Sequence, residues 1–297
     1  VSTSLGGETV ESINRKRAQD LIAPKRAATA ADIRAITGSV AEAGAPPSVT
    51  VIKSEARDGY RIDTIAMESE PGVTVAGLAG IPDGSAAKPA LLYMDSTAKE
   101  QLARRPDFEA MVKGGRIVLL LQPRGTPGPA TGVQSPLLGP FNLIALRAMM
   151  VGKSIVGLRT DDAIRAVNWL ASRPDVDRSK IAVYGNGPLG VVALHAAALD
   201  SRMARVVIEN SLADYALALN APLTRNLPEI ALDGVLRKYD LGGLMLAIAP
   251  RMVAVVNPVD AVGQAMHEAA ARKELGYALS ERVRLYQRSP GEPLPLE

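Results

Sequence analysis

The early part of the chain alternates apolar and polar residues with a period of two, a pattern that predicts strands. The turn sequences Asp58-Gly59 and Pro71-Gly72 separate the alternating stretches. Strands joined by connections this short pair in antiparallel fashion. The pattern therefore predicts an antiparallel opening to a mixed sheet, with strands over Val49–Glu55, Tyr60–Glu68 and Thr74–Ile81.

From Ala90 onward, short continuous apolar runs alternate with helical patterns. Such runs are typical of strands buried on both faces, and strand–helix–strand units predict parallel pairing. The fold class is therefore α/β, with a mostly parallel central sheet, helices on both of its faces and antiparallel N-terminal strands. We expect strands over Ala90–Met94, Arg116–Gln122, Ile181–Tyr184, Ala204–Glu209 and Met252–Asn257. We expect helices over Ala98–Lys113, Phe141–Gly152, Leu158–Ser172 (with Thr160-Asp161-Asp162 as its cap), Leu189–Leu199 and Met266–Leu279.

Two parts of the chain are less regular. Residues 1–48 contain helical patterns over Glu11–Leu21 and Ala30–Ile36 before a hinge at Pro46-Pro47, so we assign them to a linker with helices and 49–297 to one domain. A stretch near 214–249 is interrupted by prolines and glycines. A lid would sit there, but a surface connection without function explains the stretch equally well. The beginning at Val1, without methionine, indicates a processed protein or an excised domain.

Composition narrows the classes of function. Hydrophobic residues make up 47% of the 297 residues and aromatic residues only 3%, with a net charge of +3. The only tight basic cluster, Asn14-Arg15-Lys16-Arg17, is typical of a solvated helix face, so we expect no nucleic-acid partner. With no cysteine in the chain, disulfides, thiolate metal sites and a cysteine nucleophile are excluded. We expect no cofactor, no metal centre and no membrane span, since no apolar run approaches about 18 residues.

The most informative segment is Gly185-Asn186-Gly187-Pro188-Leu189-Gly190, which lies between a predicted strand and a predicted helix. Its glycines fit a dinucleotide fingerprint, and Glu209 then stands where an acid would bind a ribose. The position of the segment in the chain argues against this interpretation. The fingerprint normally follows the first strand of its domain, whereas this segment follows several predicted strands. The segment also fits the turn between strand and helix that carries the nucleophile of serine hydrolases. Gly187 would then occupy the position of the serine.

Further phrases resemble bacterial acetylxylan esterase-like α/β hydrolases, in a consistent order along the chain. They are Gln122-Pro123-Arg124-Gly125, Gly157-Leu158-Arg159-Thr160-Asp161-Asp162, Ala166–Asp177, Lys180–Gly185, His195–Arg202, Ala249-Pro250-Arg251 and Asn257–Gly263. The resemblance covers roughly Leu91 to Tyr277. It implies an α/β-hydrolase fold, an ester substrate on a carbohydrate, and a periplasmic or secreted location; the sequence otherwise leaves the compartment unknown.

The chain departs from that family at the groups that carry its chemistry. An active member needs a serine, an acid and a histidine. Gly187 stands at the serine position, and Asp260 matches the position of the acid. The only histidines, His195 and His267, lie elsewhere, and none occurs in Tyr286–Glu292, where the family's histidine loop would be.

Other residues are candidates for a remodelled site. Asp95, Ser96, Asn186 and Pro188 are expected at the pocket or at the position of an oxyanion hole, because they follow core strands. Ser211 is an alternative nucleophile at the end of another strand, and Ser154 is expected near the rim. None of these serines has an evident histidine base, and the emptied pocket could still bind an anion or a carbohydrate.

Three functions remain open. The first is a catalytically degenerate carbohydrate-esterase-like domain that supports, or binds substrate for, an active catalytic domain of the same polypeptide, or that forms a homo-oligomer. The second is an active carboxylic-ester hydrolase with a non-standard nucleophile. The third is a dinucleotide-binding module that uses Gly185–Gly190. Whether the chain is an enzyme is undecided at this point.

Overall fold

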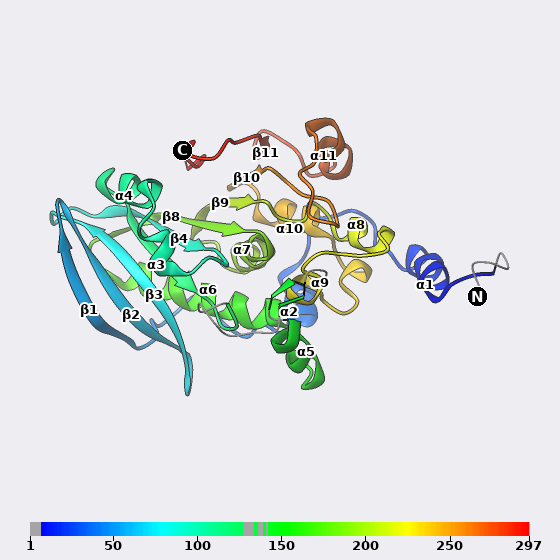
Figure 1. The fold of residues 1–297 in the computed structure, drawn as a ribbon, viewed down its shortest axis with the longest axis horizontal. Coiled ribbons are helices and arrows are strands. Elements are labelled where there is room, and N and C mark those ends of the chain that lie inside the picture. The colour runs from blue at the N-terminus through cyan, green and yellow to red at the C-terminus, as the bar shows by residue number, and fades with distance from the viewer. Residues whose placement is uncertain (1–6, 127–133, 136–138, 141, 297) are drawn as a thin grey trace.

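The computed structural model describes residues 7–126, 134–135, 139–140 and 142–296, and its centre is a mixed sheet. Nine strands lie in the order β1-β2-β3-β5-β4-β8-β9-β10-β11 (Figure 1). The pairs β1–β2, β2–β3 and β3–β5 are antiparallel, and all later pairs are parallel. The strands span Val49–Arg57 (β1), Tyr60–Glu70 (β2), Val73–Pro82 (β3), Lys88–Met94 (β4), Ile117–Gln122 (β5), Val176–Asn186 (β8), Met203–Glu209 (β9), Met252–Val256 (β10) and Val283–Tyr286 (β11). Two short strands, Gln134–Ser135 (β6) and Gly139–Pro140 (β7), pair separately.

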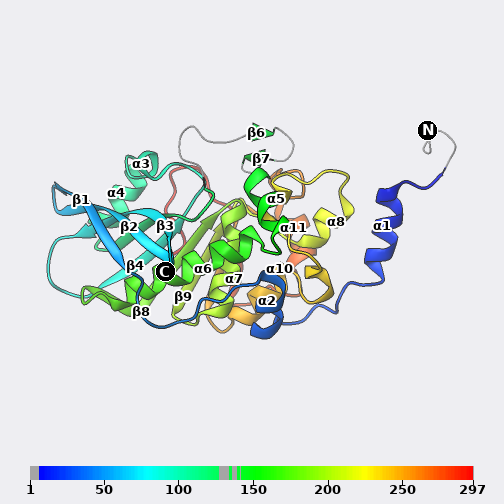
Figure 2. The same ribbon diagram turned by 90° about the horizontal axis from the view of Figure 1, so that it is seen from below.

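Helices cover both faces of the sheet, as the sequence predicts. They span Val10–Gln19 (α1), Ala30–Thr37 (α2), Lys99–Leu102 (α3), Pro106–Lys113 (α4), Asn142–Met150 (α5), Ile155–Ser172 (α6), Pro188–Leu199 (α7), Tyr215–Asn220 (α8), Leu227–Ile230 (α9), Val235–Arg237 (η2), Leu241–Ile248 (α10) and Glu268–Leu275 (α11). The helix α1 lies at one end of the molecule in both views, where it contacts α8 (Figures 1 and 2). The predicted helix over Ala98–Lys113 is two helices, because proline at 106 has no amide hydrogen to continue the first one.

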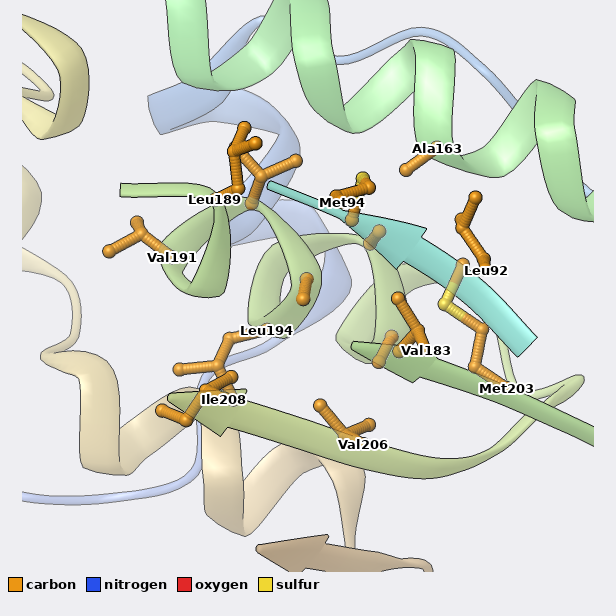
Figure 3. Close-up of a cluster of buried hydrophobic side chains, with 14 of the residues drawn as sticks. Leu92, Met94, Ala163, Val183, Leu189, Val191, Leu194, Met203, Val206 and Ile208 are labelled. Carbon is orange, nitrogen blue, oxygen red and sulfur yellow. The ribbon is translucent and has the colours of Figure 1, made fainter. Parts of the chain in front are cut away.

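The strand β4 shows why the apolar runs are continuous. Its alternate residues enter different cores: Leu92 and Met94 face the side covered by α2, α6, α7 and α10, whereas Leu91 and Tyr93 face the side covered by α3 and α4. A strand buried on both faces has no polar face to alternate with. Figure 3 shows the larger of the two cores, where side chains of α7 and of β4, β8 and β9 converge.

The prediction that Thr160-Asp161-Asp162 caps α6 is wrong. The helix begins five residues earlier than Thr160, at Ile155, and Ser154 Oγ accepts a hydrogen bond from the Gly157 amide at 3.0 Å. The two aspartates are instead buried in the helix interior. Asp161 accepts hydrogen bonds from the backbone amides of the segment that follows α2, and Asp162 binds Arg124. A capping motif and a buried pair of carboxylates have the same local sequence, and only the distant partners distinguish them.

The stretch near 214–249 folds as α8, α9, η2 and α10. The carboxyl groups of Asp214 and Asp240 cap its helices and lie together, and burial beside Asp240 raises the pKa of Asp214. A buried ion pair between Arg159 of α6 and Glu229 of α9 anchors the stretch to α6, one of the helices that cover the sheet. A lid role and the division at residue 48 stay predictions. Within the ranges given above, no helix has the length and apolar character needed to span a membrane.

Candidate functional site

The turn between β8 and α7 holds Gly187 in a conformation that side chains rarely adopt, with φ 56° and ψ −127°. The Gly187 amide donates to the Glu209 carbonyl at 2.8 Å, and Ser211 Oγ donates to the Gly187 carbonyl at 2.7 Å. The flanking glycines allow the strand and the helix to approach each other. A Cβ atom at Gly185 would overlap the Leu189 carbonyl. This is the sharp, strained strand-to-helix turn that presents a nucleophile in hydrolases.

The same turn does not favour dinucleotide binding. Its strand β8 lies inside the sheet, after β4 and β5 have already formed parallel pairs. Glu209, the expected ribose ligand, is 4% exposed. Its carboxylate accepts a hydrogen bond from Tyr184 at 2.7 Å and binds Arg288 through two nitrogens at 2.8 and 2.9 Å. A carboxylate with these buried partners is not available to a ribose.

A cavity of about 300 Å³ lies over the turn. It is lined by Gly187, Pro188, Asn210, Leu212, Arg225, Asn226, Ile230, Val259, Asp260, Gly263 and Ala265. The segments that follow β8, β9 and β10 thus meet here, together with the chain that leads into α9. Parallel strands bring their carboxyl ends to one edge of a sheet, which is where ligands bind in such folds.

Two charged side chains face this cavity. Asp260 is half-buried, and its Oδ1 accepts hydrogen bonds from the Val262 and Gln264 amides at 2.9 Å, so that it shapes the loop after β10. Arg225 has its side chain over Gly263 and is exposed. Within the ranges that the structure describes, no carboxylate lies within ion-pair distance of Arg225.

None of the described residues that line this cavity is a serine or a histidine. A Cβ atom at Gly187 would have no heavy atom within 4 Å, so the place of a nucleophile is open space. The oxyanion hole of such sites uses the backbone N–H of the residue after the nucleophile. That residue is Pro188, which carries no amide hydrogen.

Neither histidine lies at the cavity. His195 is fully buried in α7, where its Nδ1 lies 2.7 Å from the Val191 carbonyl and its Nε2 lies 3.2 Å from Tyr239 Oη. Burial lowers the pKa of His195 to about 4. His267 precedes α11 on the surface. The stretch after β11, where the resemblance placed a histidine, contributes Arg288 instead, and its guanidinium binds Glu209.

The remaining predicted residues lie beside the turn and have structural partners. Asn186 Nδ2 donates to Asp95 at 3.0 Å, and Asn186 Oδ1 accepts from Asn210, so that these side chains tie together the ends of β4, β8 and β9. Asp95 also accepts from the Thr97 amide at 2.7 Å. Ser96 is half-buried in the loop after β4. Neither Asp95 nor Ser96 lines the cavity.

The two other candidate serines are held by backbone groups. Ser211 is 2% exposed, and its hydroxyl donates to the Gly187 carbonyl. An oxygen buried in this way behind the turn is not accessible to an acyl carbon, which argues against Ser211 as a nucleophile. Ser154 caps α6 and donates to the Thr37 carbonyl at 2.7 Å.

Sequence reasoning missed four residues of this region: Asn210, Arg225, Asn226 and Arg288. Asn210 has a positive φ of 51°, and asparagine at the end of a strand was the only available signal. Arg225 and Asn226 lie in the irregular stretch, where no periodicity places side chains. Among the residues that the structure describes, no group of three or more histidine or acidic side chains could hold a metal ion.

No family model matches the sequence, and no curated protein matches it. Solved structures do. A putative acetyl xylan esterase from Bacteroides fragilis NCTC 9343 aligns with 87% of this chain and 73% of its own, at 18% identity and a TM-score of 0.69. An acetyl xylan esterase from Paenibacillus sp. R4 aligns with 94% of this chain and 95% of its own, at 18% identity and a TM-score of 0.61. A glucuronoyl esterase from Solibacter usitatus aligns over 87% and 86%, at 15% identity and a TM-score of 0.58.

These similarities establish the α/β-hydrolase fold that the sequence predicts. Identities this low carry no conclusion about activity. The arrangement of the fold nevertheless places the Gly187 turn, the loop of Asp260 and the stretch of Arg288 at one edge of the sheet.

Proposed function

We propose that this chain is a catalytically inactive, carbohydrate-esterase-like domain that binds a carbohydrate in the cavity over Gly187 without cleaving an ester. It would act beside an active catalytic domain of the same polypeptide or in a homo-oligomer. The similarity to acetyl xylan and glucuronoyl esterases supports carbohydrate as the class of ligand.

One observation carries the proposal: the turn has the geometry that presents a nucleophile, but glycine stands at the position of that nucleophile. The turn keeps the φ and ψ angles that present a nucleophile, although Gly187 has no side chain to present. Proline follows it, which removes an oxyanion donor, and Arg288 stands in the stretch expected to supply the histidine. The loss of one triad member already costs about four to six decades of rate, and further losses add little.

The cavity retains groups suited to binding. Arg225, Asn226, Asp260 and Asn210 bring amide, carboxylate and guanidinium groups to a space of about 300 Å³. Such groups donate and accept hydrogen bonds as sugar hydroxyl and acyl oxygens require. Because Gly187 has no side chain, the turn leaves room for a ligand and supplies no reactive group.

We expect no hydrolysis by this chain, and none after Gly187→Ser. The serine would fit the open space, but it would have neither a histidine base nor the amide hydrogen that Pro188 lacks. Turnover of p-nitrophenyl acetate and labelling by a fluorophosphonate probe should stay at background in both proteins. Strong labelling of the unaltered chain that Ser96→Ala or Ser211→Ala abolishes would show instead a live hydrolase with a relocated nucleophile.

We expect Arg225→Gln to weaken carbohydrate binding by about tenfold, since a hydrogen bond to a charged group contributes roughly 1.5 to 3 kcal/mol. Acetylated xylo-oligosaccharides are the probe, and isothermal titration calorimetry is the measurement. Arg57→Gln, which removes an exposed charge from the distant edge strand β1, is the matched control and should bind as the unaltered chain does. If both variants bind the oligosaccharides with equal affinity, the ligand does not bind in the cavity over Gly187.

A further inference from the structure

The helix α5 buries small side chains and exposes large apolar ones. Ala145 and Ala148 are buried against the molecule, whereas Ile144, Leu146, Met149 and Met150 are exposed. A surface helix normally buries its large apolar side chains. Met150 is 86% exposed and Val151, which follows the helix, is 72% exposed. We call Ile144, Leu146, Met149, Met150 and Val151 the α5 patch.

Other exposed apolar side chains lie on α9, which contacts α5, and on the segments next to it. The helix α5 contacts α9, whose first residue Leu227 is also exposed. Leu223 and Val262 are exposed as well, and the Arg225 amide donates to the Ala261 carbonyl at 2.8 Å, which holds their two segments together. Figure 1 shows α5 projecting from the lower side of the molecule. Several large apolar side chains exposed on one helix and its neighbour are a feature of interaction sites.

The charges on this part of the chain select the occupant. Arg147 and Lys153 are exposed within and just after α5, and neither has an acidic partner among the described residues. The sequence from 110 to 160 contains lysine and arginine but no aspartate or glutamate. Two copies of this chain that joined their α5 patches about a twofold axis would bring like charges together. A partner with an apolar interior and a negatively charged surface would complement both the apolar side chains of the α5 patch and the positive charges of Arg147 and Lys153.

We propose that the α5 patch binds the interface of an anionic lipid bilayer, with its apolar side chains inserted at the level of the headgroups and Arg147 and Lys153 paired with anionic lipids. This is peripheral binding by one side of a short helix. Because α5 contacts α9, and Asn226 and Ile230 at the two ends of α9 line the cavity over Gly187, binding would hold the cavity close to the lipid surface.

The experiment is sedimentation of the full chain with vesicles in which about one third of the lipids are phosphatidylglycerol, compared with vesicles of phosphatidylcholine alone. We expect binding to the anionic vesicles that falls at least about tenfold in Met150→Asp and in Val151→Asp. Arg147→Gln with Lys153→Gln should abolish the preference for anionic lipid. The matched control is Ile52→Asp, which puts the same charge at an exposed apolar position of the edge strand β1 and should leave binding unchanged.

Three results would overturn the proposal. They are no binding to anionic vesicles, an equal loss in Ile52→Asp, or self-association in sedimentation velocity that Met150→Asp abolishes, which would make a second copy the occupant. Thermal unfolding of every variant identifies a loss that comes from misfolding. Carbohydrate binding is measured independently, so either proposal can fail without the other.

Discussion

Replacing Gly190 with alanine is expected to lower the free energy of unfolding by about 3 kcal/mol. Gly190 lies in the first turn of α7, and a Cβ atom there would overlap Ser211 Oγ. The hydroxyl of Ser211 cannot move away freely, because it donates to the Gly187 carbonyl and is buried. Overpacking at this point would therefore displace the Gly187 turn itself. Urea denaturation followed by circular dichroism measures the loss.

A second substitution tests whether the overlap is the cause. Ser211→Gly removes both atoms that the new Cβ atom would meet most closely, and the next nearest, the Gly185 carbonyl oxygen, lies at 3.2 Å. The double variant should recover about 1 to 2 kcal/mol relative to the sum of the two single losses. Gly44→Ala, where a Cβ atom meets nothing within 4 Å, is the control and should change stability by less than about 0.5 kcal/mol. Additive losses at positions 190 and 211 would contradict the packing described for the turn.

The second large effect is expected from Asp162→Ala, which should lower the free energy of unfolding by about 3 to 5 kcal/mol. The Asp162 carboxylate has no exposed surface and accepts hydrogen bonds from the Arg124 amide at 2.8 Å, from the Arg124 guanidinium and from Ser69. Its removal leaves a largely buried guanidinium with Glu70 as its remaining carboxylate partner, at 2.8 Å. A largely buried charge that loses its buried partner costs more stability than a lost surface ion pair.

The control is Asp177→Ala. Asp177 is half-buried near the start of β8, where its carboxylate accepts hydrogen bonds from Ser179 and pairs with the exposed Lys180 at 3.4 Å, so its loss should lower the free energy of unfolding by less than about 1 kcal/mol. Thermal and urea unfolding of both variants at neutral pH provides the comparison. If Asp162→Ala proves as mild as Asp177→Ala, Arg124 reaches solvent in the native state and the buried network is not what fixes the loop at 123–126.

Much of the fold follows from local patterns in the sequence. The period of two over Tyr60–Glu68 predicts β2 to within two residues, because that strand pairs with neighbours through simple turns. The continuous apolar run at Ala90–Met94 predicts a strand with two buried faces, and β4 has them. The pattern does not predict the final strand β11, because Val283–Tyr286 is only four residues long and includes an arginine. Its pairing with β10 makes it a strand.

The candidate site was predictable only in part. The spacing of Gly185, Gly187 and Gly190 indicates a tight turn between strand and helix, since only glycine tolerates the close approaches there. The missing amide hydrogen of Pro188 was also readable from the sequence. The partners of Glu209 were not, because Tyr184 and Arg288 are 25 and 79 residues away from it.

The sequence by itself determined most of the strands and helices of the sheet region, the turn at Gly187 and the absence of a serine from that turn, because each of these depends on residues close together in the chain. Only the tertiary structure decided what the charged residues do. It buried Asp161 and Asp162 as network partners, bound Arg288 to Glu209, and brought Arg225 from the irregular stretch to the cavity. The physical reason is that an ion pair or a cavity joins elements that are distant in sequence, and the free energy of burying a charge is set by those partners.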